Sequence, residues 1–319
     1  MLRDAPTVSV LTIHHGPMRT LNRLKHALAA QTYPHTKFNW IVIDDGSWEN
    51  PPAWFDKPDA PFAIDAHRLA SNVGRARARN LALQLAKGEI LAFLDSDMEP
   101  VTVWLEMMVR AVLHTDGVIA GRYDPHPSLK PSAFLEYSHS RGAHKHHPGD
   151  RIPGRYFTSG NSAFPRHILD IAGEFDEGFH GWGGEDLEFA IRLENAGVFF
   201  YYEPRARSFH EHDITWTQQV QRYQAFSEHA IPRLLEKHPH LECQLSLNKL
   251  RTRPGRGLLS GVIRPWLLRN LCSEPVFEFV NCLVTAFPRF PWPAKVFDYL
   301  VFQLYSRSYA QNLQHGVHP

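Results

Sequence analysis

Ile90-Leu-Ala-Phe-Leu-Asp-Ser-Asp97 joins five apolar residues directly to an acidic turn. A short apolar run that is bounded by turn-forming residues is typical of a buried β-strand. We therefore expect a strand over residues 90–94, with Asp95, Ser96 and Asp97 at its carboxyl end. This stretch decides the fold class once its neighbours are taken into account.

The chain before this strand alternates apolar runs with helical patterns. Apolar runs occupy residues 8–13, 40–43 and, more weakly, 62–69, and leucines at helical spacing mark residues 21–28 and 72–87. Such alternation predicts an α/β fold, Rossmann-like, with a mostly parallel central sheet flanked by helices. Ligands of such sheets bind beyond the carboxyl ends of the strands. A second acidic turn, Asp44-Asp45-Gly46-Ser47, follows the run 40–43 and should lie at that edge.

The composition changes after residue 125. Prolines and histidines crowd residues 126–157, including a histidine-rich stretch at 139–147, and we expect a mobile loop there. Regular patterns resume with strands at 158–164 and 198–202 and with helices after Pro165, through 181–193 and over 214–237. We expect a first half at 1–125 and a second half at 126–250 that together form one domain, followed by a mainly helical C-terminal extension at 251–319.

Charge and cysteine content exclude several classes of protein. Lys and Arg total 34 against 33 Asp and Glu, so we expect no nucleic-acid partner. The three cysteines, Cys243, Cys272 and Cys282, form no C-x-x-C pair, which argues against a disulfide scaffold or a structural zinc site. The first residues lack an apolar signal-peptide core, and no stretch has the length of a membrane span. We expect a cytoplasmic globular protein.

Asp95-Ser96-Asp97 is the sharpest chemical feature. Two carboxylates at i and i+2 after a buried strand can present oxygen atoms to one divalent cation, Mn²⁺ or Mg²⁺. The alternative is a solvated Asx turn, because Asp and Ser form turns readily. A second acidic turn at the same edge favours a site over an ordinary turn.

Two further stretches combine features of ligand binding. Residues 72–80 begin a helix with three arginines, which suits a pyrophosphate but also fits a solvated basic helix. Gly181-Trp-Gly-Gly-Glu-Asp186 lets the backbone approach a ligand and offers an indole face to a sugar. Its acidic pair would lie in the first turn of a helix, where the helix dipole favours carboxylates. The alternative there is a turn with an acidic N-cap.

These stretches together resemble the family 2 nucleotide-sugar glycosyltransferases, which have the GT-A fold. The matching segments are 8–13, 43–47, 72–80, 93–97, 159–164 and 181–186, within about residues 7–212. The last segment is similar to a motif shared by β-1,4-galactosyltransferases, polypeptide N-acetylgalactosaminyltransferases and bacterial chondroitin-type polymerases. One departure is His14-His15-Gly16-Pro17, where the family often has a Pro-x-Tyr-Asn-like turn.

The resemblance makes 1–125 the nucleotide-sugar-binding half and 126–250 the acceptor-binding and catalytic half of one domain. It also implies a role for each matching residue. Asp186 would be the catalytic base with Glu185 as the other candidate, and Asp97 and His210 would bind the metal, with His212 as second choice. Contacts to the nucleotide-sugar are implied for Thr12, Asp44, Asp45, Arg79, Asp95, Ser96, Gly160, Asn161, Trp182, Gly183 and Gly184.

The resemblance also implies a reaction. A hexose or N-acetylhexosamine would move from a UDP-sugar donor to a hydroxyl of a glycan, glycolipid or peptide acceptor, with inversion; related retaining enzymes leave retention as the alternative. A catalytically inactive nucleotide-sugar-binding protein of the same fold is the second hypothesis. A phosphoryl-transfer enzyme is a weaker third, because the chain has no Gly-x-x-x-x-Gly-Lys loop.

The C-terminal extension mixes apolar, aromatic and basic residues. Trp266, Leu267 and Leu268 lie beside Arg264 and Arg269 in the sequence. This combination favours packing against the rest of the protein or a homodimer contact, and peripheral contact with the inner face of a membrane is the alternative.

Overall fold

The computed structural model describes residues 5–211, 214–245, 247 and 273–314. The chain forms two compact units. The sheet unit comprises Met1–Leu129, His139–Gly178 and Glu185–Asp213, and the helical unit comprises Lys130–Ser138, Phe179–Gly184 and Ile214–Pro319.

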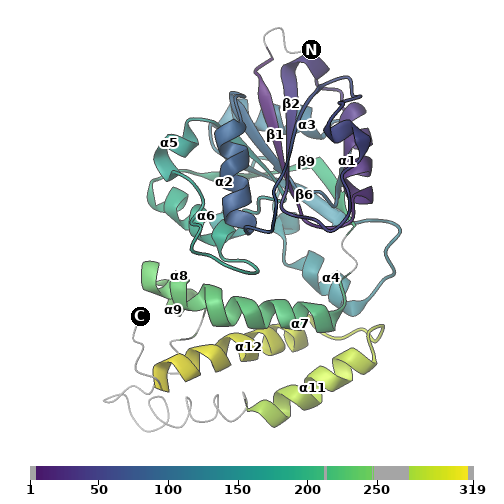
Figure 1. Cartoon of the computed structure of the whole chain (residues 1–319). Coiled ribbons are helices and arrows are strands. Elements are labelled where there is room, and N and C mark those ends of the chain that lie inside the picture. The colour runs from purple at the N-terminus through teal and green to yellow at the C-terminus, as the bar shows by residue number, and fades with distance from the viewer. Residues whose placement is uncertain (1–4, 212–213, 246, 248–272, 315–319) are drawn as a thin grey trace. The chain divides into compact units, whose positions relative to one another are not determined.

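A nine-stranded sheet forms the centre of the sheet unit (Figure 1). Its strands are β1 (Val8–His14), β2 (Phe38–Asp44), β3 (Ala63–Arg68), β4 (Ile90–Leu94), β5 (Met98–Pro100), β6 (Val118–Pro125), β7 (Arg151–Ile152), β8 (Asn161–Pro165) and β9 (Phe200–His210). The order is β3-β2-β1-β4-β8-β6-β9-β5, and β7 pairs with β9. The first four strands in this order are parallel, whereas β8, β5 and β7 pair antiparallel with their neighbours. The predicted α/β sheet is confirmed, with an antiparallel admixture.

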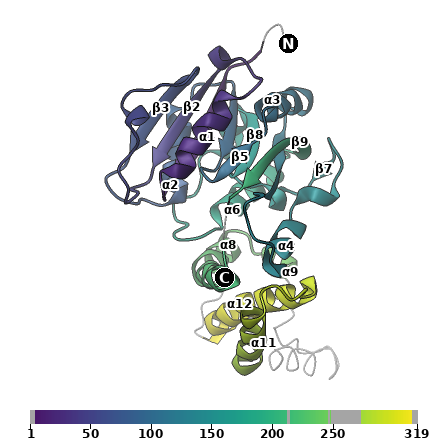
Figure 2. The same cartoon turned by 90° about the vertical axis from the view of Figure 1, so that its right-hand side faces the viewer.

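Helices cover both faces of the sheet. Helices α1 (Arg19–Ala29) and α3 (Trp104–Thr115) pack on one face, and α2 (Arg75–Leu85), α5 (Ile168–Ala172) and α6 (Glu185–Asn195) pack on the other (Figures 1 and 2). Alternate residues of a strand reach opposite faces, so Trp40 joins the α1 and α3 core while Ile41 joins the α2 and α6 core. Short 3-10 helices, η1 (His35–Lys37) and η2 (Ala53–Phe55), lie beside β2 and β3.

The expectation of a mobile loop over residues 126–157 is wrong. This stretch forms α4 (Ala133–Ser140), η3 (Ala143–Lys145), β7 and η4 (Gly154–Tyr156). Aromatic contacts explain the order, because the rings of His139 and His144 lie 5.7 and 5.9 Å from the ring of Tyr123 on β6. Burial lowers the pKa of His139 to about 4, and the nearby His210 and His144 act in the same direction.

The strand expected at residues 198–202 is longer than predicted. Strand β9 runs to His210 and pairs with β6 in parallel, with a register shift between Gly121 and Arg122. The second half of β9 contains polar residues and lacks the apolar run that predicts a strand. Its pairing with the short strand β5 extends the strand there. This extension carries His210 to the edge where β4 ends.

The helical unit contains α7 (Trp216–Ala225), the π-helical turn η5 (Phe226–Ala230), α8 (Ile231–Lys237), α9 (Leu241–Gln244), α11 (Glu274–Ala286) and α12 (Ala294–Gln314). The helices expected over residues 214–237 are confirmed. A capping box formed by Thr215 and Gln218 begins α7. An aromatic core that includes Trp216, Phe277 and Phe297 joins α7, α11 and α12.

Some residues of interest lie outside the described part of the chain: His212, Cys272 and the segment with Arg264, Trp266 and Arg269. Among the helices of the described ranges, none has both the length and the apolar character needed to cross a membrane.

Candidate active site

The two acidic turns lie at the same edge of the sheet. Strand β1 pairs in parallel with both β2 and β4, so Asp44 at the end of β2 and Asp95 after β4 follow neighbouring parallel strands. The backbone N–H of Asp45 donates to the carbonyl of His14 at 2.7 Å, which fixes the first turn to β1. The predicted convergence of the acidic turns is a consequence of this strand order.

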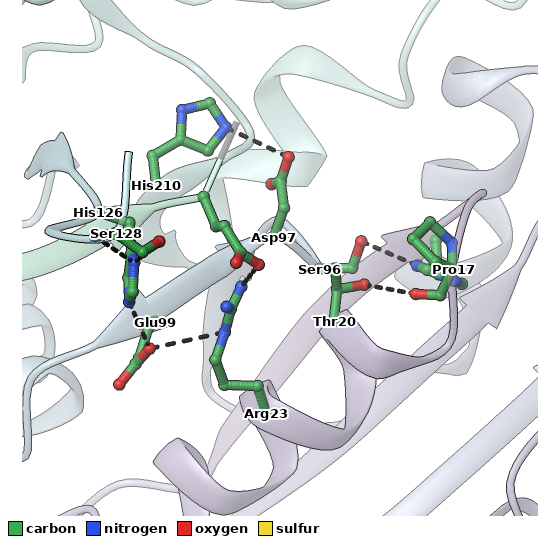
Figure 3. Close-up of polar contacts among 11 residues, drawn as sticks. Pro17, Thr20, Arg23, Ser96, Asp97, Glu99, His126, Ser128 and His210 are labelled. Atoms are coloured by element: carbon green, nitrogen blue, oxygen red, sulfur yellow. Dashed lines mark hydrogen bonds and ion pairs between the residues drawn. The ribbon is translucent and has the colours of Figure 1, made fainter. Parts of the chain in front are cut away.

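Asp97 and His210 face each other. Strand β5 pairs antiparallel with β9, so Met98 is opposite His210 and Asp97 comes just before the pair. The Oδ2 atom of Asp97 lies 3.3 Å from Nε2 of His210 (Figure 3). The backbone N–H of Glu211 also donates to the carbonyl of Asp97 at 2.9 Å. Asp97 and His210, which are 113 positions apart in the sequence, are thereby held as one pair.

A cationic side chain supports this pair from the other side of the edge. Arg23 on α1 forms ion pairs with Glu99, at 3.5 Å, and with Glu211 (Figure 3). Nε2 of His126 lies 3.2 Å from the same carboxylate of Glu99. Arg23 therefore joins β5 to the end of β9 and neutralises two carboxylates that flank the Asp97 and His210 pair.

The donor set of Asp97 and His210 fits a divalent cation such as Mn²⁺, which accepts carboxylate ligands, with the imidazole as a nitrogen ligand. In the described part of the chain, no group of three or more His, Cys, Asp and Glu side chains is arranged to hold a metal ion alone. Two protein ligands suffice where phosphate and water oxygens complete the shell. The pair therefore fits a metal that is shared with a phosphorylated ligand.

Asp95 is enclosed beside Gly160. The backbone N–H of Asp95 donates to the carbonyl of Gly160 at 3.0 Å. A Cβ atom at position 160 would lie 2.8 Å from Oδ2 of Asp95, so only glycine leaves this carboxylate its place. Burial raises the pKa of Asp95, and the neighbouring Asp97 raises it further, while Arg79 opposes both effects.

Ser96 is held by His14. Nε2 of His14 lies 3.1 Å from the carbonyl oxygen of Gly16, which can only accept, so Nε2 carries the proton. Burial lowers the pKa of His14 against the pull of Asp44, and the ring is therefore neutral. Its Nδ1 atom, 2.9 Å from Oγ of Ser96, then accepts the hydroxyl hydrogen.

Glu185 and Asp186 form a carboxylate pair at the start of α6. Nη1 of Arg79 donates to Oε1 of Glu185 at 2.7 Å and lies 3.7 Å from Oδ1 of Asp186. The Glu185 side chain is only 6% exposed, whereas that of Asp186 is 24% exposed. Burial would raise the pKa of Glu185, but the Arg79 guanidinium overcomes it and holds that pKa below its usual value. Arg79, expected on the nucleotide, lies against this pair.

Asp186 is held on its second oxygen by Ser159. Both the backbone N–H and the hydroxyl of Ser159 donate to Oδ2 of Asp186, each at 3.1 Å. Burial raises the pKa of Asp186, and Glu185 raises it too, while Arg79 and the bonds from Ser159 lower it. A partly exposed carboxylate with a raised pKa is a stronger base than an ordinary aspartate.

Asp45 reaches the segment before α2. Its carboxylate accepts hydrogen bonds from the backbone N–H groups of Val73, at 2.7 Å, and Gly74, at 3.1 Å. Asp44 accepts from the N–H of Ser47 at 3.0 Å and lies 3.4 Å from Arg68. The carboxylate of Asp45 thus accepts hydrogen bonds from backbone N–H groups in the segment 72–80, which the sequence suggested for binding a pyrophosphate.

Two residues that were expected to contact the nucleotide-sugar, Thr12 and Asn161, have buried side chains. The Thr12 hydroxyl donates to the carbonyl of Leu94 and accepts from the indole of Trp40. The Asn161 amide accepts from the indole of Trp104 and donates to the carbonyl of Arg122. Both side chains are buried and hydrogen-bonded within the protein.

Trp182, Gly183 and Gly184 belong to the helical unit. The Trp182 ring makes edge contacts with Tyr223 and Phe226. Gly183 and Gly184 have φ values of 83° and 103°, a region that favours glycine. At Gly184 a Cβ atom would also lie 2.6 Å from the ring of Phe179.

The sequence analysis missed Ser159 and His14 as site residues. Ser159 was part of a matching segment, yet no pattern marked its contact with Asp186, 27 positions away. His14 was noted only as a departure from the family pattern. Its position at the end of β1, next to both acidic turns, was the available signal.

Two family models match the chain. The one described as Glycosyl transferase family 2 matches residues 9–170, and the one described as N-terminal domain of galactosyltransferase matches residues 141–213. The first covers both acidic turns, and the second covers the carboxylate pair and His210.

Curated relatives share part of the chain. Hyaluronan synthase of Pasteurella multocida is 30% identical over 210 residues, 56% of this chain and 22% of that protein. Chondroitin synthase of P. multocida (strain Pm70) is 28% identical, covering 54% and 22%. Pre-mycofactocin glycosyltransferase of Mycobacterium tuberculosis (strain ATCC 25618 / H37Rv) is 29% identical, covering 72% and 47%. The chain spans less than half the length of each of these relatives.

Solved structures share the fold. The mannosyltransferase PcManGT from Pyrobaculum calidifontis, in complex with GDP-Man and Mn²⁺, superposes with a TM-score of 0.60 at 18% identity, over 99% of this chain and 89% of that one. TarS 1–349 of S. aureus, in complex with UDP, gives 0.53 at 17% identity, over 96% and 92%. The expected GT-A fold is confirmed.

Proposed function

The chain belongs to glycosyl transferase family 2, and from that premise we propose that it transfers a hexose or N-acetylhexosamine from a UDP-sugar to an acceptor hydroxyl. One observation carries the proposal. Within the sheet unit, Arg79 lies 2.7 Å from Glu185 and 3.7 Å from Asp186, and the dipeptide Ser159-Gly160 is hydrogen-bonded both to Asp186 and to Asp95. The proposed base and the proposed donor site are therefore parts of one charged cluster.

Asp186 is the proposed base, in preference to Glu185. Glu185 is bonded to Arg79 and is held ionised with a lowered pKa, so it is a poor proton acceptor. Asp186 is more exposed and has a raised pKa. A base works best when its pKa approaches the working pH.

In the proposed step the acceptor oxygen attacks the anomeric carbon of the donor sugar. A bond from that carbon to the acceptor oxygen forms as its bond to the diphosphate oxygen breaks, and the electron pair leaves with UDP. The hydroxyl proton of the acceptor passes to the carboxylate of Asp186. A single displacement from the face opposite the leaving group inverts the anomeric carbon. Product anomers, distinguished by NMR coupling constants, test this against retention.

Asp97 and His210 are the proposed metal ligands. A Mn²⁺ or Mg²⁺ ion bound there would neutralise the charge that develops on the departing diphosphate. The protein's own contribution is to hold the two ligands as a pair, through the pairing of β5 with β9 and the Glu211 hydrogen bond.

The remaining donor contacts are proposed for residues at the same edge. Asp44 and Asp45 would contact the nucleoside, and Asp95, Ser96 and Gly160 the ribose and the diphosphate. Trp182, Gly183 and Gly184 belong to the helical unit, and their contact with the sugar stays a prediction from the sequence. UDP is the proposed nucleotide, as the motif resemblance implies; TarS was solved with UDP and PcManGT with GDP-Man, so both nucleotides are compared in the test.

Donor hydrolysis tests the function directly. UDP-, GDP- and dTDP-sugars are each incubated with the protein and Mn²⁺, and nucleotide release is measured with and without EDTA. We expect release from a UDP-sugar that EDTA abolishes and that Asp186→Asn reduces, while UDP binding by calorimetry is kept. Binding without any turnover would instead support the inactive binding protein.

The helical unit offers a surface for a lipid partner. Phe279, Phe287 and Phe290 are all more than half exposed. Arg289 and Lys295 lie near them in the sequence, and Glu278 and Asp298 bound the stretch 279–297, which itself contains no Asp or Glu. Exposed aromatic rings beside cations complement an anionic bilayer surface, and such a surface is the proposed partner.

Co-sedimentation tests this contact with phosphatidylcholine vesicles that contain or lack phosphatidylglycerol. We expect binding only to the anionic vesicles, lost when Phe287 and Phe290 are both replaced by Ser. The matched control is Leu113→Ser, which removes an exposed apolar side chain of the sheet unit. A concentration-dependent dimer in ultracentrifugation, with no vesicle binding, would assign the surface to a second copy instead.

A further inference from the structure

We infer that Ser159 is the positioning residue of the proposed base, fixing Asp186 relative to the donor site. The inference rests on the proposed function, because it presumes that Asp186 takes the proton. Ser159 itself is 2% exposed and lies in the segment that leads into β8.

The first argument is the number of donors on one atom. Oδ2 of Asp186 accepts both the N–H and the hydroxyl of Ser159, each at 3.1 Å. Two donors from one residue hold this oxygen atom in place. Arg79 approaches the other oxygen, Oδ1, at 3.7 Å, so the carboxylate is held from both sides.

The second argument is the connection of Ser159 to the donor site. The next residue, Gly160, accepts the backbone N–H of Asp95 at 3.0 Å, and its missing side chain leaves room for the Asp95 carboxylate. One dipeptide therefore contacts the proposed base on one side and the acidic turn on the other. The position of Asp186 relative to the bound donor follows from this dipeptide.

The charged groups around Asp186 set the direction of the pH effect. Arg79 on α2 and Glu185 on α6 face it, Arg79 also acts on Asp95, and Arg75 acts on both Glu185 and Asp95. None of these groups changes when the Ser159 hydroxyl is removed. A hydrogen bond to the ionised carboxylate favours the ionised form, so its loss moves the pKa upward.

The test compares Ser159→Ala, Ser159→Thr and Ser162→Ala by steady-state transfer kinetics over a range of pH. Ser159→Ala should lower kcat about tenfold, the effect of one charge-assisted hydrogen bond, with the donor KM unchanged. The acidic limb of its kcat profile should move to higher pH. Ser159→Thr keeps the hydroxyl and should restore both values.

Ser162→Ala is the matched control. Ser162 lies three positions further on in β8, is fully buried, and its hydroxyl has no hydrogen-bond partner among the described residues. Ser162→Ala removes the same hydroxyl oxygen atom as Ser159→Ala, so a loss of packing alone would lower the kcat of both variants equally. We expect Ser162→Ala to keep the kcat and pH profile of the original protein.

A double variant separates the positioning role of Ser159 from the role of Asp186 as the base. In an Asp186→Glu background the carboxylate no longer meets Ser159, so adding Ser159→Ala should change kcat less than about twofold. If Asp186→Asn abolishes transfer but Ser159→Ala leaves kcat and the acidic limb unchanged, the Ser159 role is overturned and the base is retained. If Asp186→Asn remains active, the proposed base itself is wrong and the Ser159 role falls with it.

Discussion

Nη1 of Arg79 lies 2.7 Å from Oε1 of Glu185, and this ion pair joins α2 to α6 across 106 positions of sequence. Both side chains are less than a tenth exposed. Asp186 lies next to the pair, so Arg79 supports the fold and sets the electrostatics of the proposed base at once.

Replacing Arg79 by Met should destabilise the protein strongly. The substitution leaves the Glu185 charge buried without its partner, and breaking such a pair costs about 3 kcal/mol or more of unfolding free energy. Arg77→Met is the control, because Arg77 is exposed on the same helix. Urea unfolding measures both, and equal stability of the two variants would contradict the structural role of the pair.

Replacing Glu185 by Gln should move the acidic limb of the kcat profile to lower pH. Glu185 raises the pKa of Asp186, so the loss of its charge lowers that pKa and keeps the base ionised in more acidic solution. Glu174→Gln removes the same charge from an exposed position and should leave the limb in place. Complete loss of transfer in Glu185→Gln at every pH would make Glu185 the base.

Removing either ligand of the proposed metal should weaken Mn²⁺ binding in the presence of UDP. For Asp97→Asn and for His210→Ala we expect a dissociation constant raised about tenfold or more, as even indirect supports of a metal site have effects of that size. Electron paramagnetic resonance of free Mn²⁺ gives the constant. His114→Ala, on the exposed side of α3, should bind like the original protein.

His14 should make the protein less stable as the pH falls below 6.5. Burial lowers the pKa of His14 from its usual 6.5, so the unfolded chain binds the proton first and the free energy of unfolding declines from there down to the lowered pKa. The slope is at most about 1.4 kcal/mol per pH unit. His14→Asn should reduce the slope, and His26→Asn, exposed on α1, should not. Chemical unfolding at several pH values provides the measurement.

Local patterns were sufficient for the first half of the fold. Strands β1 to β4 and helices α1 and α2 follow from apolar runs and leucine spacing. The buried face or faces of each element leave a regular apolar pattern in its own sequence. The stretch 126–157 and the second half of β9 could not be read in this way. The stretch 126–157 is ordered by contacts such as that of His139 with Tyr123 on the preceding strand β6. The second half of β9 is ordered by pairing with β5 and β6, which lie far from it in the sequence.

The candidate site shows the same division. The acidic turns and the carboxylate pair were visible as residue types at strand and helix ends. Thr12 and Asn161 were expected at the donor, and the structure adds that their side chains are hydrogen-bonded to Leu94, Trp104 and Arg122 inside the protein, which no motif records. Ser159 and Arg79 acquired their roles from contacts that no local pattern records.

By itself, the sequence determined the alternation of strands and helices, the acidic ends of β2 and β4, and membership of the family. These depend on neighbours within a few positions, where periodicity and turn chemistry act. Only the tertiary structure decided that His210 meets Asp97, that Arg79 binds Glu185, and that Ser159 holds Asp186. The physical reason is that charge pairing and hydrogen bonding act over a few ångströms in space. Only the packing of strands and helices in the fold brings those atoms within reach.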